Sequence, residues 1–300
     1  MKRLIVISLI SVLLTSVECK KDNSIGESNE FIIVTSFYPI YIIAKNVAYN
    51  IGDVKVVNMT PVHAGCLHDY SVTTEDMKNL EKADIFLING AGMEIFIDRV
   101  IERYPKLKTV ELSKGIRLID DMDGKNPHIW MSVNNAISMV KTCVEALCQA
   151  DIKNELLYKK NGDSYIKELS NLKVEMDERL KKFRGEKVVT FHEAFSYFAK
   201  DYGLTIAAVV EHNPGSEPSA KELADIIDTV RRLGIKYLFA ERQYSSSSVD
   251  IIAKETGVKV FMLDPAVTCL QTGVDERDAY IKAMERNSSV LIGAFNGQEQ

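Results

Sequence analysis

The chain has 300 residues, a formal net charge of −5 and a hydrophobic share of 46%. This length suits one large domain or two small lobes, and the composition is ordinary for a globular protein. A mildly acidic chain without a cluster of Lys and Arg argues against nucleic acid as its main partner.

The N-terminus has the pattern of an export signal. Lys2 and Arg3 precede an apolar run from Leu4 to Leu14, which is too short to span a bilayer as a mature helix. We therefore expect residues 1–18 to be a signal peptide and the protein to be exported.

Cys19 follows the apolar run directly and is followed by a mostly polar stretch. This arrangement is typical of a bacterial lipoprotein, so Cys19 is a tentative lipidation site and residues 19–30 a flexible tether. Val17 and Glu18 stand where such signals prefer small residues, so an ordinary secretory signal cut nearby is the alternative. The mature protein would then be either anchored to the outer face of the membrane or periplasmic.

The other cysteines are Cys66, Cys143, Cys148 and Cys269. Four thiols are enough for disulfides in an exported protein. Cys143 and Cys148 are five residues apart in a helical stretch, which is a poor spacing for a disulfide, and we interpret both as buried thiols. The sequence leaves the state of all four open.

Short apolar runs rich in Val, Ile and Phe alternate with helical patterns along the chain. Continuous apolar strands separated by helices predict parallel sheets that are covered on both faces. We therefore expect an α/β fold with two lobes, residues 31–150 and 185–300, each built on about four strands. The predicted strands are 31–36, 54–59, 85–89, 109–112, 187–191, 205–210, 237–240 and 259–263.

A long polar segment separates the halves. Residues 151–183 contain no proline, and apolar residues recur in them at helical spacing. We expect one bridging helix over residues 151–184, roughly 45 Å long at 1.5 Å per residue. Two shorter helices broken near Asn161 and Gly162 are the alternative.

The positions of the histidines indicate the chemistry. His192 follows one predicted strand directly, Asp264 follows another, and His68 and His128 lie in loops after strands of the first half. Ligands bind beyond the carboxyl ends of strands in open parallel sheets. Two facing lobes would bring the four side chains into one cleft, and three imidazoles with a carboxylate suit a tetrahedral zinc ion.

Several motifs in this order resemble the metal-binding solute-binding proteins of bacterial ABC-type zinc and manganese transporters. The histidine-containing blocks are the most specific of them. The motifs are Val34-Thr35-Ser36-Phe37-Tyr38-Pro39, the segment from Ala83 to Gly90 followed by Met93-Glu94, Asn126-Pro127-His128-Ile129-Trp130-Met131-Ser132, the segment from Phe191 to Phe198, and the segment from Pro218 to Leu223.

The resemblance implies two α/β lobes bridged by one long helix, and metal ligands at His68, His128, His192 and Asp264. It also implies delivery of the metal to an ABC permease in the membrane, by a chain that we expect to be a monomer and not an enzyme. The chain departs from the family where Cys66-Leu67-His68 replaces Asp-Pro before the first ligand. His63 and Cys66 are therefore rivals for that position.

Zinc is favoured over manganese or iron because His192 offers nitrogen where manganese-binding relatives tend to have glutamate. Among other function classes, a metal-dependent hydrolase would need an open coordination position for water, whereas four protein ligands close the tetrahedron. A binding protein for a larger solute, such as an iron chelate, would need a roomy cleft. Three further polar residues lie at strand ends in the second half: Glu211, His212 and Glu241. They either hydrogen-bond the ligating imidazoles or are plain rim positions.

Overall fold

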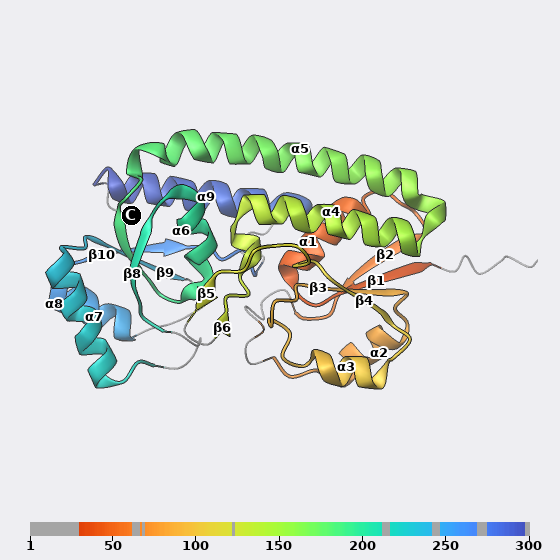
Figure 1. Cartoon of the computed structure of the whole chain (residues 1–300), viewed down its shortest axis with the longest axis horizontal. Helices are drawn as coiled ribbons and strands as arrows, with labels where there is room; N and C mark the ends of the chain where they lie inside the picture. Colours follow the sequence, from red (N-terminus) through yellow and green to blue (C-terminus); the bar gives the residue numbers. More distant parts are fainter. Residues whose placement is uncertain are drawn as a thin grey trace, which may run out of the picture.

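Figure 1 shows the computed structural model of the chain, which describes residues 30–61, 67, 70–121, 124–211, 217–241, 247–268 and 275–297. Several predictions fall outside these residues. They concern the signal peptide, Cys19, His63, Cys66, His68, His212 and Cys269.

The first half of the chain forms a four-stranded parallel sheet in the order β2-β1-β3-β4. All four predicted strands are confirmed to within one residue at each end. β3 is buried along its whole length, as its unbroken apolar sequence requires. The strands are β1 (Phe31–Thr35), β2 (Val54–Asn58), β3 (Ile85–Ile88) and β4 (Lys108–Glu111); the helices are α1 (Tyr38–Val47), α2 (Thr74–Glu81), α3 (Ile97–Arg103) and α4 (Val133–Ala150).

The second half repeats this plan with the order β10-β9-β7-β8, again all parallel. Helix α7 shows how local sequence sets an element, because Ser219 and Glu222 form a capping box at its start and Gly234 ends it at a φ of 62°. The strands are β7 (Lys187–Thr190), β8 (Thr205–Val209), β9 (Tyr237–Glu241) and β10 (Lys259–Leu263); the helices are α6 (Ser196–Tyr202), α7 (Ala220–Leu233), α8 (Ser247–Thr256) and α9 (Ala279–Phe295).

A small antiparallel hairpin of β5 (Asp120–Asp121) and β6 (Gly124–Lys125) was not predicted. Its strands are too short to show a period of two in the sequence. Single 3-10 turns add to the connections: η1 (Ile129–Met131), η2 (Ile152–Asn154), η3 (Lys181–Phe183), η4 (Glu193–Phe195) and η5 (Glu276–Asp278).

The predicted bridging helix is confirmed as α5 (Glu155–Leu180), with η2 before it and η3 after it. It runs unbroken through Gly162, so the alternative of two helices was wrong. In Figure 1 it lies across the top of both lobes, beside α4 and α9. One hydrophobic cluster contains buried residues of both sheets together with Val140, Leu169 and Leu291 from α4, α5 and α9, so the lobes share a core. The domain boundaries at residues 150 and 184 stay a prediction.

Two of the cysteines lie in α4. Cys143 is a free, fully buried thiol, and burial raises its pKa well above the usual range. Cys148 is also a free thiol but is half-buried, so the expectation of burial holds for the first of the two alone. Across the described residues, none of the helices combines the length and the apolar character that crossing a bilayer requires.

Candidate metal centre

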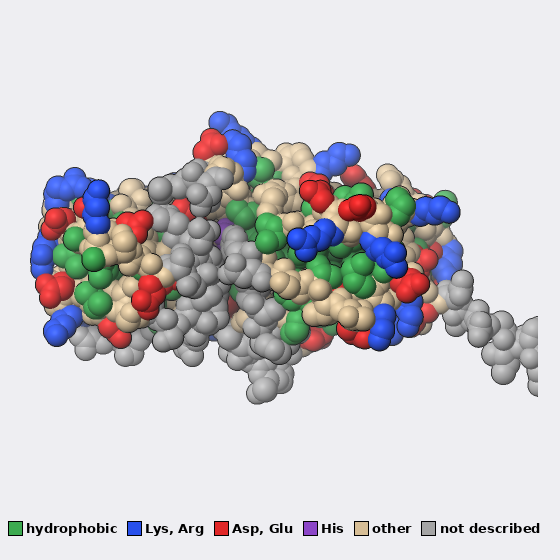
Figure 2. Space-filling view, turned by 90° about the horizontal axis from the view of Figure 1, so that it is seen from below, with side chains coloured by type: hydrophobic (Ala, Val, Ile, Leu, Met, Phe, Trp, Pro, Cys, Tyr) green, Lys and Arg blue, Asp and Glu red, His purple; other side chains and the backbone are tan. Residues whose placement is uncertain are grey.

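The parallel strands of the second lobe bring three candidate side chains to one edge of the sheet. His192 lies two residues beyond the end of β7, Glu241 is the last residue of β9, and Asp264 is the first residue after β10. Thr190 pairs with Phe239, so two residues further on His192 lies beside Glu241. Figure 2 shows histidine surface, in purple, between the two lobes.

His128 reaches the same place from the loop between β6 and η1, and hydrogen bonds from both lobes hold that loop. From the first lobe, Asn89 Nδ2 donates to the Pro127 carbonyl at 2.9 Å. From the second lobe, the Tyr197 hydroxyl donates to the Asn126 carbonyl at 2.7 Å. Asn126 Nδ2 in turn donates to the Glu193 carbonyl at 3.0 Å. The position of His128 is therefore fixed relative to both sheets.

Both imidazole rings are buried and held at Nδ1. Asn126 Oδ1 accepts the backbone N–H of His128 at 2.9 Å and lies 3.1 Å from Nδ1 of the same residue. Because an amide oxygen can only accept, Nδ1 of His128 is the donor in this hydrogen bond. The Glu241 carboxylate lies 2.5 Å from Nδ1 of His192, and neither side chain is exposed to solvent. A carboxylate accepts, so Nδ1 of His192 also carries hydrogen.

The two remaining ring nitrogens face each other. Nε2 of His128 and Nε2 of His192 are 3.2 Å apart. When both rings are neutral with Nδ1 protonated, both Nε2 atoms are acceptors, and a cation between them satisfies both. Two nitrogens that ligate one tetrahedral zinc at about 2.0–2.1 Å are separated by about 3.3 Å. The residues present thus fit a metal ion that takes nitrogen ligands.

Asp264 is buried on the loop after β10 but has its own partners. Oδ1 accepts the Ala266 N–H at 2.8 Å, and Oδ2 accepts from Arg286 on α9 at 2.7 Å. The next residue, Pro265, accepts the indole N–H of Trp130 at 2.8 Å, and the Trp130 ring lies 5.3 Å from the His128 ring between centroids. Trp130 therefore connects the Asp264 loop to the His128 loop.

Two of the four predicted ligands, His128 and His192, are brought together. His68 lies outside the described residues, and within those that are described no group of three or more His, Cys, Asp and Glu side chains is placed to hold a metal. Sequence reasoning named Glu241 as a possible partner of an imidazole, and the contact with His192 confirms it. Glu211 is buried at the end of β8, where its backbone N–H bonds the Phe191 carbonyl.

Sequence reasoning missed a network beneath the His128 loop. The buried Glu94 carboxylate accepts from Ser36 Oγ at 2.7 Å and from the N–H groups of Asn89 and Gly90 at 2.8 and 3.0 Å. Asn89 is the residue that bonds the Pro127 carbonyl. Burial raises the pKa of Glu94 to about 7, against the opposing effect of these donors. The pattern Met93-Glu94 was noted in the sequence, but nothing local to it identified the partners.

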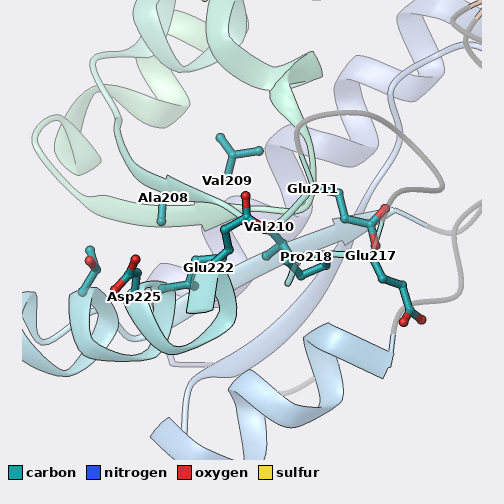
Figure 3. Close-up of a pocket in the computed structure, with 10 residues that line it drawn as sticks. Ala208, Val209, Val210, Glu211, Glu217, Pro218, Glu222 and Asp225 are labelled. Atoms are coloured by element: carbon teal, nitrogen blue, oxygen red, sulfur yellow. The ribbon is translucent and has the colours of Figure 1, made fainter. Parts of the chain in front are cut away.

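The second lobe also contains a groove of about 510 Å³ between β8 and the start of α7, shown in Figure 3. Its lining includes the acidic side chains of Glu211, Glu217, Glu222 and Asp225. Two of these have local structural contacts, because Glu217 accepts from Ser247 Oγ and Glu222 caps α7. Among the described residues that line this groove, neither His128, His192 nor Asp264 occurs, so it is separate from the histidine pair.

Known proteins resemble this chain in sequence and in structure. The chain is 28% identical over 277 residues to the zinc-binding lipoprotein AdcA of Streptococcus pneumoniae (strain ATCC BAA-255 / R6), covering 86% of this chain and 54% of the relative. It is 28% identical over 288 residues to the high-affinity zinc uptake system protein ZnuA of Bacillus subtilis (strain 168), covering 90% and 89%. The chain thus spans about half the length of the AdcA relative.

Among solved structures, the SBP FpvC from Pseudomonas aeruginosa in complex with Mn2+ has a TM-score of 0.80 and 28% identity. The match covers 89% of this chain and 99% of that one. The model of the family described as zinc-uptake complex component A, periplasmic, matches residues 33–294. Because that match takes in both sheets, the bridging helix and the histidine pair, the chain belongs to this zinc-uptake family.

Proposed function

We propose that this protein binds one divalent transition metal ion outside the cytoplasmic membrane, with zinc favoured, and delivers it to an ABC permease for import. The pair of Nε2 atoms 3.2 Å apart supports the metal-binding step most directly. The family and the printed names of the relatives support the transport role. The ion is cargo in this proposal and does not take part in a reaction.

The proposed ligands are His68, His128, His192 and Asp264, with His63 and Cys66 as rivals of the first. Two described neighbours of His68 belong to the first lobe. Leu67 is fully buried, its carbonyl accepts the Tyr70 N–H at 3.1 Å, and the Tyr70 hydroxyl donates to Asp76 at 2.7 Å. These contacts hold Leu67 and Tyr70 in the first lobe, which supports a ligand from that lobe.

Zinc is favoured over manganese because at least two ligands are imidazoles, which suit zinc better than the harder manganese ion. The Glu241 carboxylate on Nδ1 of His192 strengthens this preference, since it fixes the ring and raises the basicity of Nε2. Manganese is the alternative, and an FpvC complex with Mn2+ is among the similar structures. A site closed by four protein ligands leaves no position for a reactive water, which argues for binding and against a hydrolase.

The metal-binding proposal is tested by titration of the exported form against a chromogenic zinc chelator. We expect one tight site per chain, lost in His128→Ala and in His192→Ala. Glu255→Gln is the matched control, because Glu255 forms an exposed ion pair with Arg231 away from the predicted ligands. Unchanged affinity in both histidine variants, or two equally tight sites, would overturn the proposal. Competition between zinc and manganese decides the metal.

We further propose that Cys19 is lipidated and anchors the protein to the outer face of the membrane. The lipoprotein relative supports this. In the native host, Cys19→Ala should leave an exported protein that is recovered in the soluble fraction. Recovery of the variant in the membrane fraction, unchanged, would show that another feature anchors it.

A further inference from the structure

Helix η2 and the first turn of α5 present apolar side chains to solvent. Ile152, Leu156 and Leu157 are 75%, 81% and 43% exposed. Most of the later apolar side chains of α5 are buried, among them Tyr158, Tyr165, Leu169, Leu172 and Met176. A surface of this kind on an otherwise well-packed helix marks a candidate interaction site.

Lysines lie near these side chains. Lys153, Lys159 and Lys160 are exposed on the same turns, and Lys167 is exposed about three turns beyond Leu156. Acidic groups offset these charges, because Lys153 pairs with Asp53, Lys159 pairs with Glu155, and Asp163 and Glu168 are exposed near the other two lysines. We call Ile152, Leu156, Leu157 and these four lysines the Leu156 surface. It is a local concentration of exposed apolar side chains without a net basic charge.

This surface lies where the N-terminal segment enters the fold. The Phe31 N–H donates to the Asp53 carbonyl at 2.9 Å, and the Asp53 carboxylate bonds Lys153 at 2.6 Å and Asn154 at 3.1 Å. In Figure 1 the start of β1 and the first turns of α5 are at the same end of the molecule. The residues from 20 to 30, between Cys19 and β1, span at most about 36–40 Å.

We propose that the Leu156 surface rests on the lipid bilayer and holds the protein in one orientation on the membrane. The proposal depends on the anchoring at Cys19 proposed above, because a tether keeps the surface at high local concentration near the lipid and makes a weak contact sufficient. Ile and Leu side chains enter the boundary between headgroups and acyl chains, while the lysine side chains extend to the headgroups. None of the proposed metal ligands belongs to this surface, so the contact leaves them free.

The test uses the mature chain with Cys19→Ala, so that binding reports the folded surface and not the lipid. Sedimentation with vesicles of phosphatidylcholine and phosphatidylglycerol should capture the protein. Ile152→Ser with Leu156→Ser should abolish capture. Lys160→Glu with Lys167→Glu makes the surface negative, so it should weaken capture by these vesicles by roughly fivefold or more for each lysine.

Val174→Ser is the matched control, because Val174 is 64% exposed on the same helix but lies outside the Leu156 surface, and it should bind as wild type does. Zinc titration of every variant should be unchanged, which separates failure of this proposal from failure of metal binding. Equal vesicle binding by wild type and Ile152→Ser/Leu156→Ser would overturn the proposal, and so would no binding by wild type. Concentration-dependent dimers that this double variant abolishes would assign the surface to a second copy of the chain and overturn it as well.

Discussion

Nε2 of His128 and Nε2 of His192 lie 3.2 Å apart, although the two residues are 64 positions apart in the chain and come from different kinds of structure. One belongs to a loop tied to both lobes, and the other follows a strand of the second sheet. Each ring is orientated by an oxygen on its far side, from Asn126 and Glu241. The two rings are therefore already orientated towards one point, which lowers the cost of ordering the ligands on binding.

Glu241 should control zinc affinity without being a ligand. Its carboxylate fixes the tautomer of His192 and makes Nε2 more basic, and therefore a stronger metal ligand. We expect Glu241→Ala to weaken zinc binding by about 10–100-fold, which is the usual effect of losing such a partner. Glu241→Gln keeps an acceptor without the charge and should lose less. Competition titration at constant pH measures both, and equal affinities in wild type and Glu241→Ala would show that the contact has no role in binding.

Arg286 should act on the site through Asp264. Its guanidinium bonds Oδ2, and Asn287 bonds both the N–H and the carbonyl of Asp264. A carboxylate held in this way is orientated for a metal, so Arg286→Met should weaken zinc binding by about tenfold. Arg231→Met removes an arginine from an exposed ion pair elsewhere and should have no effect. Tighter binding in Arg286→Met would mean that the arginine competes with the metal for the carboxylate.

Glu94 should make the stability of the metal-free protein depend on pH. Burial raises its pKa from the ordinary value of 4.5 to about 7, so between these values the folded state holds a proton that the unfolded chain releases. This stabilisation is complete below about pH 4.5 and is lost as the pH rises through about 7. Glu94→Gln cannot titrate. The free energy of unfolding of wild type minus that of Glu94→Gln should therefore fall between pH 5 and pH 8, by on the order of 3 kcal/mol. Urea unfolding at several pH values measures this difference, and a constant difference would show that Glu94 titrates as in the unfolded chain.

The positions of the strands, and most of the site residues at the edge of the second sheet, could be predicted from the sequence. The run Ile85–Ile88 is buried throughout because a parallel strand covered on both faces must be apolar at every position. His192 and Glu241 could be placed near each other because parallel strands end at one edge. Their contact then follows from the register of β7 and β9.

The partners of the site residues could not be predicted in the same way. Arg286 reaches Asp264 from α9, and Asn89 reaches Pro127 across 38 residues, so neither contact has a local pattern. Asn126 orientates the His128 ring through the shape of one loop, which no periodicity encodes. Gly162 indicated a possible break because glycine is a poor helix former, but packing of α5 against α4 overrides that preference.

Close packing at Gly162 leads to a prediction about stability. A Cβ at this position would lie 2.3 Å from Cγ2 of Val144 on α4. Gly162→Ala should therefore destabilise the fold by about 1–3 kcal/mol through overpacking, reduced by about 1 kcal/mol from the better helix propensity of alanine. Adding Val144→Ala removes the obstructing methyl groups, so the double variant should be more stable than the sum of the two single effects. A double-mutant cycle by urea unfolding measures the coupling, and simple additivity would show that the helices separate to accept the methyl group at no cost.

Metal binding should change the loops and leave the relative position of the lobes unchanged. Helix α5 has no proline to bend it. It packs against α1 and α4 from the first half of the chain and against α9 from the second half. The lobes are also joined by hydrogen bonds from Trp130 Nε1 to the Pro265 carbonyl at 2.8 Å and from the Tyr280 hydroxyl to the Trp130 carbonyl at 2.7 Å. A wide hinge motion would have to break these bonds and divide a shared core, whereas a sharp bend in a regular helix is costly.

X-ray scattering curves of the metal-free and zinc-bound forms should therefore superimpose, while hydrogen exchange slows near His68 and Asp264. Amides in the middle of α5 provide the internal reference, because their exchange should be the same in both forms. A large decrease in the radius of gyration with zinc would contradict the rigid connection. Unchanged exchange near both ligands would contradict a local response of the loops, since ligands fixed by a metal must open less often than free ones.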